Sequence, residues 1–319
     1  MDTVKVCFVG IGSIAKRHIR NLRYIAKEKK FDIIIDAFRR NDLPVDGVNH
    51  VFCDFNALPN DYDAIFITNP TAQHLNTLKI FQEKGKNFFV EKPIVSLSQI
   101  NEARELSLRK DSYYYVACPL RYNAVINYIK ENVKVEDVIS VRSISSSYLP
   151  DWRPNQDYRD SYSSHKDMGG GVSIDLIHEW DYLTYLFGFP QKVMSMIGKK
   201  SELEIDSDDY AIYIAEYEKM IVELHLDYFG RNTIREIQLF TKEDTIIGDL
   251  VSNSISFLKR QKRLDFNEER DDFQRREIQY FLNKIMNRQQ QVKEYYHALS
   301  VLELTQGSVI NERVGTDTK

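Results

Sequence analysis

The stretch VKVCFVGIGSIAKRH, residues 4–18, decides how the first part of the chain folds. An apolar run is followed at once by two glycines and then by a segment with helical periodicity. Gly10, Gly12 and Ala15 fit the GxGxx(G/A) pattern, in which a tight turn lets backbone amides at a helix N-terminus approach a pyrophosphate. The alternative is a glycine turn without a ligand. The strand before the glycines and the helix after them favour dinucleotide binding.

Length and composition are those of a soluble protein with two domains. The chain has 319 residues, of which 43% are hydrophobic and 28% charged, and its net charge is -4; that is more chain than one ordinary core organises. The basic run at residues 258–263 is followed directly by the acidic DFNEERDD, so we interpret it as solvated surface and expect no nucleic-acid partner. No stretch approaches the roughly 18 apolar residues of a membrane span, and residues 1–10 lack the features of a secretory signal.

Cysteine usage points to a reducing compartment. Cys7, Cys53 and Cys118 are odd in number, widely spaced and set among apolar residues, which is typical of buried thiols. Because the sequence has no CxxC or paired Cys/His spacing, we expect no structural zinc site. The expected location is the cytoplasm.

The pattern of apolar and polar residues changes between residues 118 and 135. Before this point, short β-branched runs alternate with helical stretches, which predicts an α/β fold with a doubly wound parallel Rossmann sheet. After it, longer strands with period-2 patterning predict an α+β domain with a large, mostly antiparallel sheet. We therefore predict a first domain over residues 1–120 and a second over residues 121–319, with a final helix near residues 292–306 that packs back on the first domain.

The end of the second strand bears on the choice of nicotinamide cofactor. An acid there binds the free 2′-hydroxyl of NAD, whereas arginine accommodates the 2′-phosphate of NADP. The strand at residues 32–38 runs out into Arg39 and Arg40, and Asp36 lies two or three residues too early for the acidic role. Although arginines after a strand are common on surfaces, we favour NADP(H) over NAD(H).

Four segments, in this order, resemble the Gfo/Idh/MocA oxidoreductases: VGIGSIAKRHIRNL, ITNPTAQH, FVEKP and GGGVSIDLIHEWDYLTYLFG. The segments between them resemble a branch of that family associated with surface-polysaccharide sugars. The resemblance implies an NAD(P)-dependent enzyme that transfers a hydride between nicotinamide and a hydroxyl or keto group of a sugar or nucleotide-sugar. It also implies that the second domain binds the substrate and assembles the chain into a homodimer or homotetramer.

The resemblance also assigns residues to the cofactor and the substrate. Lys92 would reach the nicotinamide ribose and the reacting hydroxyl, Pro93 is often preceded by a cis bond, and Arg121 corresponds to an arginine near the substrate. Outside this context each would be interpreted as a turn residue or a solvated charge. The other residues expected at the cofactor are Ser13, Ile14, Thr68, Asn69, Pro70, His74 and Glu91.

The stretch GGGVSIDLIHEWDYL, residues 169–183, allows four interpretations: a phosphate cradle, a metal site, an acid/base pair or an amphipathic helix. It lacks the second histidine of an HExxH motif, so we predict no metal. The glycines would serve a second phosphate cradle or, equally well, close packing of the backbone. On a continuous helix the polar side chains would share one side, which is also the pattern of a solvent-facing helix.

The resemblance assigns the chemistry to Lys92, Asp175 and His178. A histidine can move the hydroxyl proton, while a lysine ammonium polarises the oxygen. Three positions separate Asp175 from His178, whereas better-known family members have four, and both spacings keep the pair on neighbouring parts of one helical face. We expect His178 to transfer the proton and Asp175 to orient the substrate or the imidazole, although this division of roles stays open.

An aromatic and basic loop completes the expected site. Arginine with stacking rings suits a phosphorylated or nucleotide-linked ligand, but a tyrosine-rich loop that packs on a partner subunit would look the same. Two other functions stay open: a catalytically silent regulator or sensor with the same fold, and a reductase of a non-sugar carbonyl or imine. The expected substrate residues are Tyr148, Trp152, Arg153, Tyr158 and Tyr162, with Arg159 in the same loop.

Overall fold

The computed structural model describes residues 3–307, which fall into two compact units. The first unit comprises the chain up to Pro119 together with Glu269–Ser300, and the second comprises Leu120–Glu268 and the residues from Val301. The segment from Glu269 was predicted in the second domain but belongs to the first unit, because the helix that it forms packs on the first helix of the chain. Residues 1–2 and 308–319, at the ends of the two predicted domains, lie outside the described residues.

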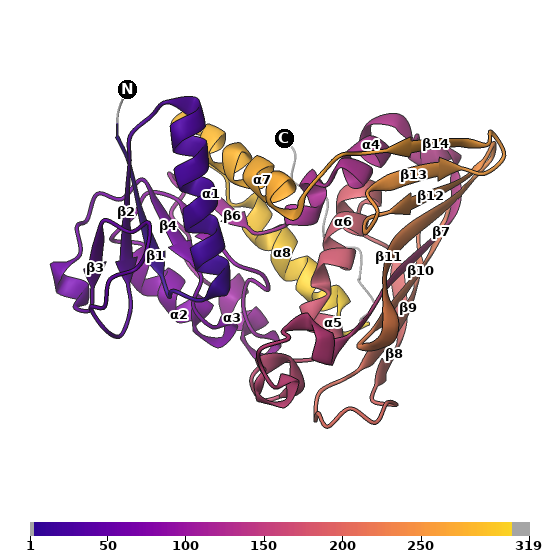
Figure 1. Cartoon of the computed structure of the whole chain (residues 1–319), viewed down its shortest axis with the longest axis horizontal. Coiled ribbons are helices and arrows are strands. Elements are labelled where there is room, and N and C mark those ends of the chain that lie inside the picture. The colour runs from indigo at the N-terminus through magenta and orange to yellow at the C-terminus, as the bar shows by residue number, and fades with distance from the viewer. Residues whose placement is uncertain (1–2, 308–319) are drawn as a thin grey trace. The chain divides into compact units, whose positions relative to one another are not determined.

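The first unit contains the predicted Rossmann sheet. Its six strands run parallel in the order β3-β2-β1-β4-β5-β6 (Figure 1). In this doubly wound order, ligands bind at the carboxyl ends of the strands. The three-residue strand β3 at the edge was not predicted. The strands are β1 (Val4–Val9), β2 (Ile33–Phe38), β3 (His50–Phe52), β4 (Ala64–Ile67), β5 (Phe88–Val90) and β6 (Tyr114–Val116).

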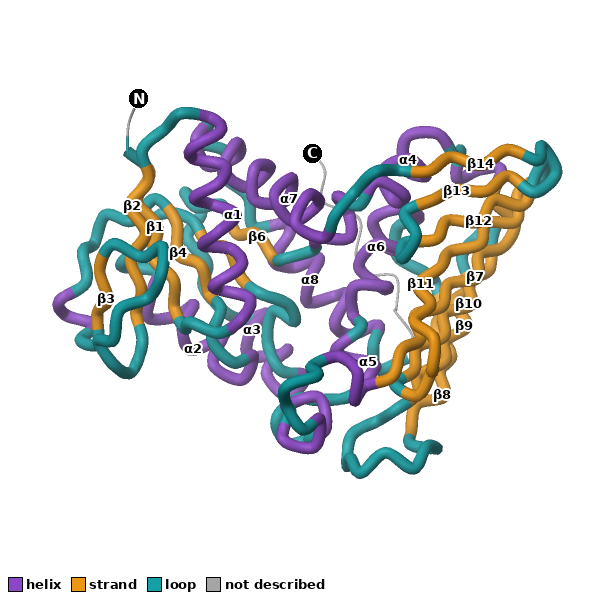
Figure 2. The backbone as a smooth tube through the Cα atoms, viewed as in Figure 1, coloured by secondary structure: helices purple, strands orange, loops and turns teal. Residues whose placement is uncertain are grey.

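Helices surround this sheet within the first unit. The views in Figures 1 and 2 place α7 beside α1, and the two helices are in contact. The helix that follows β5 is short and ends at Arg104. Most of α8 belongs to this unit, and the dividing line falls after Ser300. The helices are α1 (Ser13–Lys29), α2 (Thr71–Phe81), α3 (Ile100–Arg104), α7 (Arg270–Met286) and α8 (Lys293–Leu304).

The second unit is built on the predicted large sheet. Eight strands lie in the order β14-β13-β12-β11-β7-β10-β9-β8, and all neighbours are antiparallel except β7 and β10. Residues 245–257 form a hairpin, because the Asp249 carboxylate accepts the Val251 and Ser252 amides and turns the chain. The strands are β7 (Val138–Tyr148), β8 (Lys192–Gly198), β9 (Tyr210–Glu216), β10 (Ile221–Asp227), β11 (Phe229–Thr241), β12 (Thr245–Asp249), β13 (Ser254–Phe257) and β14 (Lys262–Asp265).

Three helices cover one face of this sheet: α4 (Ala124–Asn132), α5 (Val172–Asp175) and α6 (Ile177–Phe187). Figure 1 shows them on the same side of the strands. The other face carries exposed apolar side chains, among them Met194, Met196 and Ile214. The sheet of the second unit therefore has one helix-covered inner face and one open outer face.

The cysteines differ in part from the prediction. Cys7 and Cys118 are buried, but Cys53 is exposed. Cys53 directly follows β3, which lies at the edge of its sheet. The basic run at residues 258–263 is exposed, as predicted. Within residues 3–307, no helix is both long and apolar enough to cross a membrane.

Candidate active site

The glycine loop between β1 and α1 has the geometry of a phosphate cradle. Gly10 has a φ of 88°, and a Cβ there would lie 2.7 Å from the Asn69 Cα, so only glycine fits. Gly12 precedes α1, and a Cβ at this position would meet nothing within 4 Å. No side chain caps this helix end and its first turn has no acid. Its amides, which begin at Ser13 and Ile14, can therefore bind an anionic pyrophosphate.

The end of β2 leaves two arginines available. The Asp36 carboxylate accepts a hydrogen bond from the Tyr62 hydroxyl (2.8 Å) and lies 2.9 Å from His50 Nδ1, so it is engaged inside the sheet. The side chains of Arg39 and Arg40 form no hydrogen bond or ion pair with any described residue. This arrangement has room for a phosphate but presents no acid to a ribose.

The loop after β4 is fastened to the glycine loop. The Thr68 hydroxyl donates to the Gly10 carbonyl (2.7 Å), and the Asn69 amide donates to the Thr77 hydroxyl (2.7 Å). The other amide atom of Asn69, Oδ1, is buried and accepts no hydrogen bond from the described residues. A buried acceptor without a donor is costly, so this oxygen suits a donor from a bound cofactor. Pro70 follows and immediately precedes α2.

His74 connects this loop to the end of β5. Its Nε2 lies 2.8 Å from the Asn69 carbonyl oxygen and its Nδ1 lies 3.0 Å from that of Pro93. Burial lowers the pKa of His74 below its ordinary value. The Lys92–Pro93 peptide bond is cis, as the resemblance implied. His74 therefore acts here as a structural link between two strand ends.

Glu91 forms a buried clamp that the sequence did not reveal. Its Oε1 lies 2.5 Å from Nε2 of His18, on α1, and its Oε2 accepts the backbone N–H of Lys92 (3.2 Å). Burial opposes ionisation of Glu91, but the hydrogen bond and charge of His18 outweigh it and lower the Glu91 pKa. The sequence offered one indication that His18 would be buried: it lies three residues after Ala15 and so on the same side of the predicted helix.

In the second unit, Asp175 is buried and hydrogen-bonded by Tyr228. Asp175 ends α5 and is 4% exposed, and the Tyr228 hydroxyl donates to its Oδ2 at 2.5 Å. Burial and the Asp175 carboxylate raise the pKa of Tyr228 well above its ordinary value. Local burial of the phenol and a hydrogen bond to the Asp175 carboxylate also raise the pKa of Tyr162, although the residue as a whole is 41% exposed, so the phenol end lies beside the carboxylate while the rest of the residue meets solvent. Tyr228 was missed because it is 53 residues away in the sequence.

The predicted continuous helix is interrupted at Leu176, which lies between α5 and α6 with φ -95° and ψ 24°. Asp175 and His178 therefore lie on two successive short helices and not on one helical face. His178 is half-buried in the first turn of α6. The prediction that these side chains share one side of a helix is wrong, because it assumed that the helix continues through Leu176.

The polar side of α6 faces the sheet and not solvent. Glu179 is fully buried with its Oε1 2.9 Å from Nε of Arg235, and the hydroxyls of Tyr182 and Ser143 lie 2.6 Å apart. Burial raises the pKa of Glu179, and the charge of Arg235 partly offsets this. A solvent-facing amphipathic helix is therefore excluded, because Ser143 of β7 meets the Tyr182 hydroxyl and Arg235 of β11 meets the Glu179 carboxylate.

Two of the expected substrate groups are engaged elsewhere in the second unit. Arg121 forms a bidentate ion pair with Asp181, at 2.6 and 2.9 Å. The Tyr158 hydroxyl accepts the Glu204 amide (3.2 Å), and Arg159 pairs with Asp157 and Glu204. These groups already have protein partners of their own.

The remaining loop residues gather around Tyr228. The Trp152 ring packs edge-on against Tyr228, with centroids 5.2 Å apart, and its Nε1 donates to the Ser147 hydroxyl. Arg153 lies over the Tyr162 ring. Tyr148, at the end of β7, pairs with the neighbour of Tyr228 in β11. Most of the expected aromatic loop therefore surrounds the Asp175–Tyr228 pair.

Two of the three glycines before α5, Gly170 and Gly171, serve close packing, whereas a Cβ on Gly169 would meet nothing within 4 Å. A Cβ on Gly170 would lie 2.1 Å from the Tyr162 carbonyl oxygen, and one on Gly171 would lie 2.2 Å from the Asp208 carboxylate. Both contacts are within the second unit, so protein atoms occupy the space beside Gly170 and Gly171 and leave no room there for a phosphate. Close packing of the backbone therefore accounts for Gly170 and Gly171, and only Gly169 stays open to the cradle interpretation.

Comparisons with known proteins agree with this geometry. The model described as "Oxidoreductase family, NAD-binding Rossmann fold" matches residues 4–117, and that of the "GFO/IDH/MocA C-terminal domain" matches residues 127–246. The chain is 28% identical over 186 residues to "Uncharacterized oxidoreductase YrbE" of Bacillus subtilis (strain 168); the match covers 56% of this chain and spans about half, 52%, of that relative.

Solved structures share the fold over almost the whole chain. A levoglucosan dehydrogenase in complex with NADH superposes with a TM-score of 0.80 at 15% identity, and covers 96% of each chain. UDP-N-acetylglucosamine 3-dehydrogenase GnnA from Acidithiobacillus ferrooxidans has a TM-score of 0.74 at 17% identity, again over 96% of each. Myo-inositol 2-dehydrogenase from Lactobacillus plantarum has 0.74 at 16%, also over 96% of each. At these identities the likeness is one of fold.

Proposed function

The chain belongs to the Gfo/Idh/MocA oxidoreductase family, and we propose that it transfers a hydride between NADP(H) and a hydroxyl or keto group of a sugar or nucleotide-sugar. The observation that carries this proposal is the convergence of three strand ends in the first unit. The ends of β1, β4 and β5 are neighbours in the sheet and bear Gly10, Asn69 and Lys92. Contacts of Asn69 with Gly10 and of His74 with Asn69 and Pro93 hold them together.

The first unit would hold the cofactor. Amides of the uncapped α1 N-terminus bind the pyrophosphate, and Asn69 Oδ1 accepts a hydrogen bond from the cofactor. When bound, the nicotinamide supplies or accepts the hydride. The Lys92 ammonium polarises the substrate oxygen, and the Glu91 clamp on the Lys92 amide fixes the backbone from which that side chain extends.

The second unit would handle the substrate proton. We assign proton transfer to His178, whose neutral ring can accept a proton near neutral pH. Asp175 orients the substrate or the imidazole, and Tyr228 fixes the carboxylate. The deep burial of Asp175 and the partial exposure of His178 support this division of roles.

The preference for NADP(H) rests on Arg39 and Arg40, which have no acidic partner among the described residues. A 2′-phosphate would bind their guanidinium groups through charge-assisted hydrogen bonds. The double variant R39A/R40A should lose affinity for NADPH and keep that for NADH. Equal losses for both cofactors, measured by fluorescence titration, would contradict this preference.

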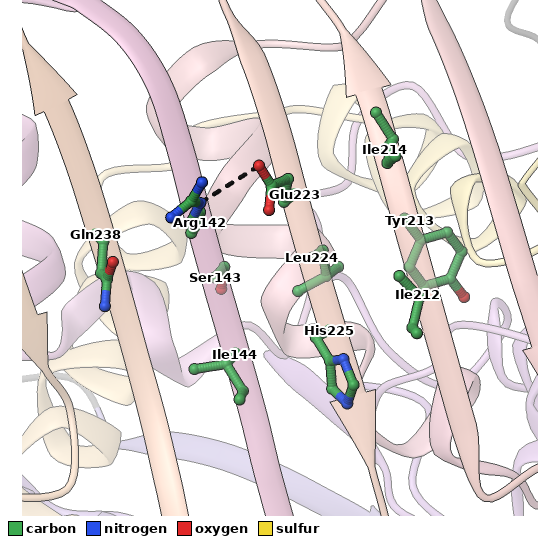
Figure 3. Close-up of a pocket in the computed structure, with 10 residues that line it drawn as sticks. All are labelled: Arg142, Ser143, Ile144, Ile212, Tyr213, Ile214, Glu223, Leu224, His225 and Gln238. Carbon is green, nitrogen blue, oxygen red and sulfur yellow. Dashed lines mark hydrogen bonds and ion pairs between the residues drawn. The ribbon is translucent and has the colours of Figure 1, made fainter. Parts of the chain in front are cut away.

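We further propose that the chain self-associates through the outer face of the sheet in the second unit. Figure 3 shows a shallow pocket on this face, where Ile212 and Ile214 lie beside Arg142, Glu223 and His225. Exposed apolar patches of this kind mark interaction sites, and the Arg142–Glu223 pair leaves the patch electrically balanced. A charged residue at Ile214 (I214E) should lower the molar mass measured by light scattering. The free thiols of the three cysteines suit a reducing compartment, so we propose that the chain assembles in the cytoplasm.

The enzyme assay follows NADPH absorbance with a panel of free sugars, keto sugars and nucleotide-sugars. Turnover that K92A or H178A reduces by about two or more orders of magnitude supports catalysis by these residues. If the chain binds NADPH but both variants leave every turnover unchanged, the catalytic assignment fails. Binding without turnover of any substrate would favour a regulator with the same fold.

A further inference from the structure

The hydrogen-bonded group around Asp175 meets solvent at Tyr162. Asp175 is 4% exposed, and Tyr228, which donates to its Oδ2 at 2.5 Å, is fully buried. Tyr162 hydrogen-bonds to the same carboxylate, but 41% of the residue is exposed. A substrate can touch only surface that solvent also reaches. Of these three residues, Tyr162 therefore offers the surface on which a ligand can lie.

The position of Tyr162 is set by the loop that carries it. Tyr162 opens a short 3-10 turn, Tyr162–Ser164. A Cβ on Gly170 would lie 2.1 Å from the Tyr162 carbonyl oxygen, so the backbone of Tyr162 lies against the chain that enters α5. The Ser207 hydroxyl donates to the Ser163 carbonyl (2.7 Å) and ties the turn to a distant part of the chain. Packing thus places Tyr162, which is not a random surface side chain.

The Tyr162 side chain is held at both ends. Its backbone is packed at Gly170 and its hydroxyl is bound at Asp175, so the ring between them keeps one orientation. The guanidinium of Arg153 lies 5.6 Å from the ring centroid, on one side of the ring. Binding a ligand costs conformational entropy when it orders a mobile side chain. A ring that is already fixed avoids most of this cost.

The face of such a ring suits a sugar. An aromatic ring carries partial negative charge on its face and partial positive charge at its edge. The C–H hydrogens of a sugar are positively polarised by the neighbouring oxygens, and in the ring form several of them point to the same side. Binding sites for small molecules commonly combine aromatic walls with a few polar groups that fix orientation. Tyr162 and Asp175 supply one of each.

We propose that Tyr162 is the residue through which this group contacts the substrate, and that its ring stacks on the C–H face of a sugar in the ring form. The inference rests on the proposed function, because it takes the substrate to be a sugar. Asp175 is then a positioning residue, which orients the substrate through Tyr162 and does not touch it. The substrate class is narrowed to ring-form sugars, since an open-chain polyol presents no continuous C–H face.

The test measures sugar binding to the NADPH-loaded protein by calorimetry. Glucose, N-acetylglucosamine and UDP-glucose are the ring-form probes, and sorbitol is the open-chain probe. Y162A should weaken binding of the preferred ring-form probe about 5- to 30-fold, whereas Y162W keeps an aromatic face and should retain most of the affinity. The matched control is Y24A, because Tyr24 is 50% exposed and also has an arginine, Arg275, over its ring, at 4.0 Å from the centroid.

A second variant separates the ring of Tyr162 from its link to Asp175. Y162F keeps the ring and removes the hydroxyl, so it should bind the ring-form probe nearly as tightly as the wild type does. With a sugar that the enzyme turns over, Y162F should lower kcat about 10-fold and leave KM almost unchanged, whereas Y162A should raise KM as well. A tyrosine that only stabilised the loop would not divide the two kinetic constants in this way.

The outcomes distinguish this inference from the proposed function. The inference is overturned if Y162A binds every ring-form probe as tightly as Y24A does, if the wild type binds sorbitol as tightly as its preferred ring-form probe, or if it binds no ring-form probe. Equal thermal unfolding of ligand-free Y162A and Y24A shows that weaker binding is not a loss of fold. Hydride transfer is read separately: its absence with every substrate counts against the proposed function, whereas weaker binding of the ring-form probe to Y162A still supports this site.

Discussion

Replacing Glu91 with glutamine perturbs the buried clamp that holds the backbone of Lys92. The His18 side chain is 1% exposed and that of Glu91 is 12% exposed, and their polar atoms lie 2.5 Å apart. A hydrogen bond to a charged group contributes about 1.5–3 kcal/mol. We expect E91Q to lower the free energy of unfolding at pH 7 by about 2 kcal/mol, which for a protein of this size is a fall in Tm of roughly 3 °C.

The pH dependence gives this prediction its sign. His18 lowers the Glu91 pKa in the folded protein despite the opposing effect of burial. A carboxylate with a depressed folded pKa contributes stability that is present above its unfolded pKa and lost as pH falls through the folded value. The gap between wild type and E91Q should therefore be full at neutral pH and shrink below about pH 4.3, the ordinary pKa of glutamate.

The assay is urea unfolding between pH 7 and the onset of acid unfolding, with E102Q as the control. Glu102 also pairs with a cation, Lys79, but its side chain is 60% exposed, and such surface pairs contribute about 0–1 kcal/mol. E91Q should also weaken NADPH binding, because Glu91 accepts the Lys92 amide. The reasoning is refuted if E91Q is as stable as E102Q at pH 7, or if its deficit does not change with pH.

Three further predictions test the rest of the site. Y228F removes the hydroxyl that donates to Asp175; we expect kcat to fall about 10- to 100-fold with little change in NADPH affinity, and equal kcat in both proteins would sink the role given to Tyr228. G10A forces a Cβ against Asn69 at a φ of 88°; it should abolish NADPH binding in a titration and lower Tm, so a variant that binds normally would rule out the glycine cradle. E179Q removes a carboxyl whose pKa is raised by burial; wild-type stability should fall as pH rises from the unfolded to the folded pKa of Glu179, whereas E179Q lacks this loss, and parallel stability profiles in urea would contradict it.

The parts that the sequence predicted are those encoded over short distances. Gly10, Gly12 and Ala15 lie within six residues, so their spacing alone indicates a strand, a turn and a helix. The period-2 strands and the βαβ units are local patterns of the same kind. Lys92 and His178 were named from a family resemblance, and no local pattern would have distinguished them from solvated charges.

The parts that were missed depend on contacts between distant residues. Tyr228 meets Asp175 because β10 delivers it there, and His18 meets Glu91 across 73 residues. The interruption at Leu176 was also invisible, because the residues around it have ordinary helical periodicity.

The alternation of β7 carries a further consequence. Its period-2 pattern suggested a sheet with apolar residues inside and polar residues outside. In the structure Ser143 and Ser145 are buried on the side of α6, while Ile144 between them lines the pocket on the outer face. Ser143 accounts for the buried Tyr182 hydroxyl, since polar side chains need polar partners there, and Arg235 is the ion-pair partner of the buried Glu179.

The same inversion bears on the outer face. Because Ser143 and Ser145 point inward, Ile144 between them points outward, and β9, two strands away, likewise presents Ile212 and Ile214, which are 36% and 40% exposed. Leaving such a face in water forfeits hydrophobic stabilisation, about 25 cal/mol for each Å² of apolar surface that a partner would cover. One strand pattern thus supports both a polar interior beside Asp175 and the self-association proposed for the outer face. If light scattering finds a monomer at micromolar concentration, no second copy covers the outer apolar face, and the link between the polar inner face and self-association fails.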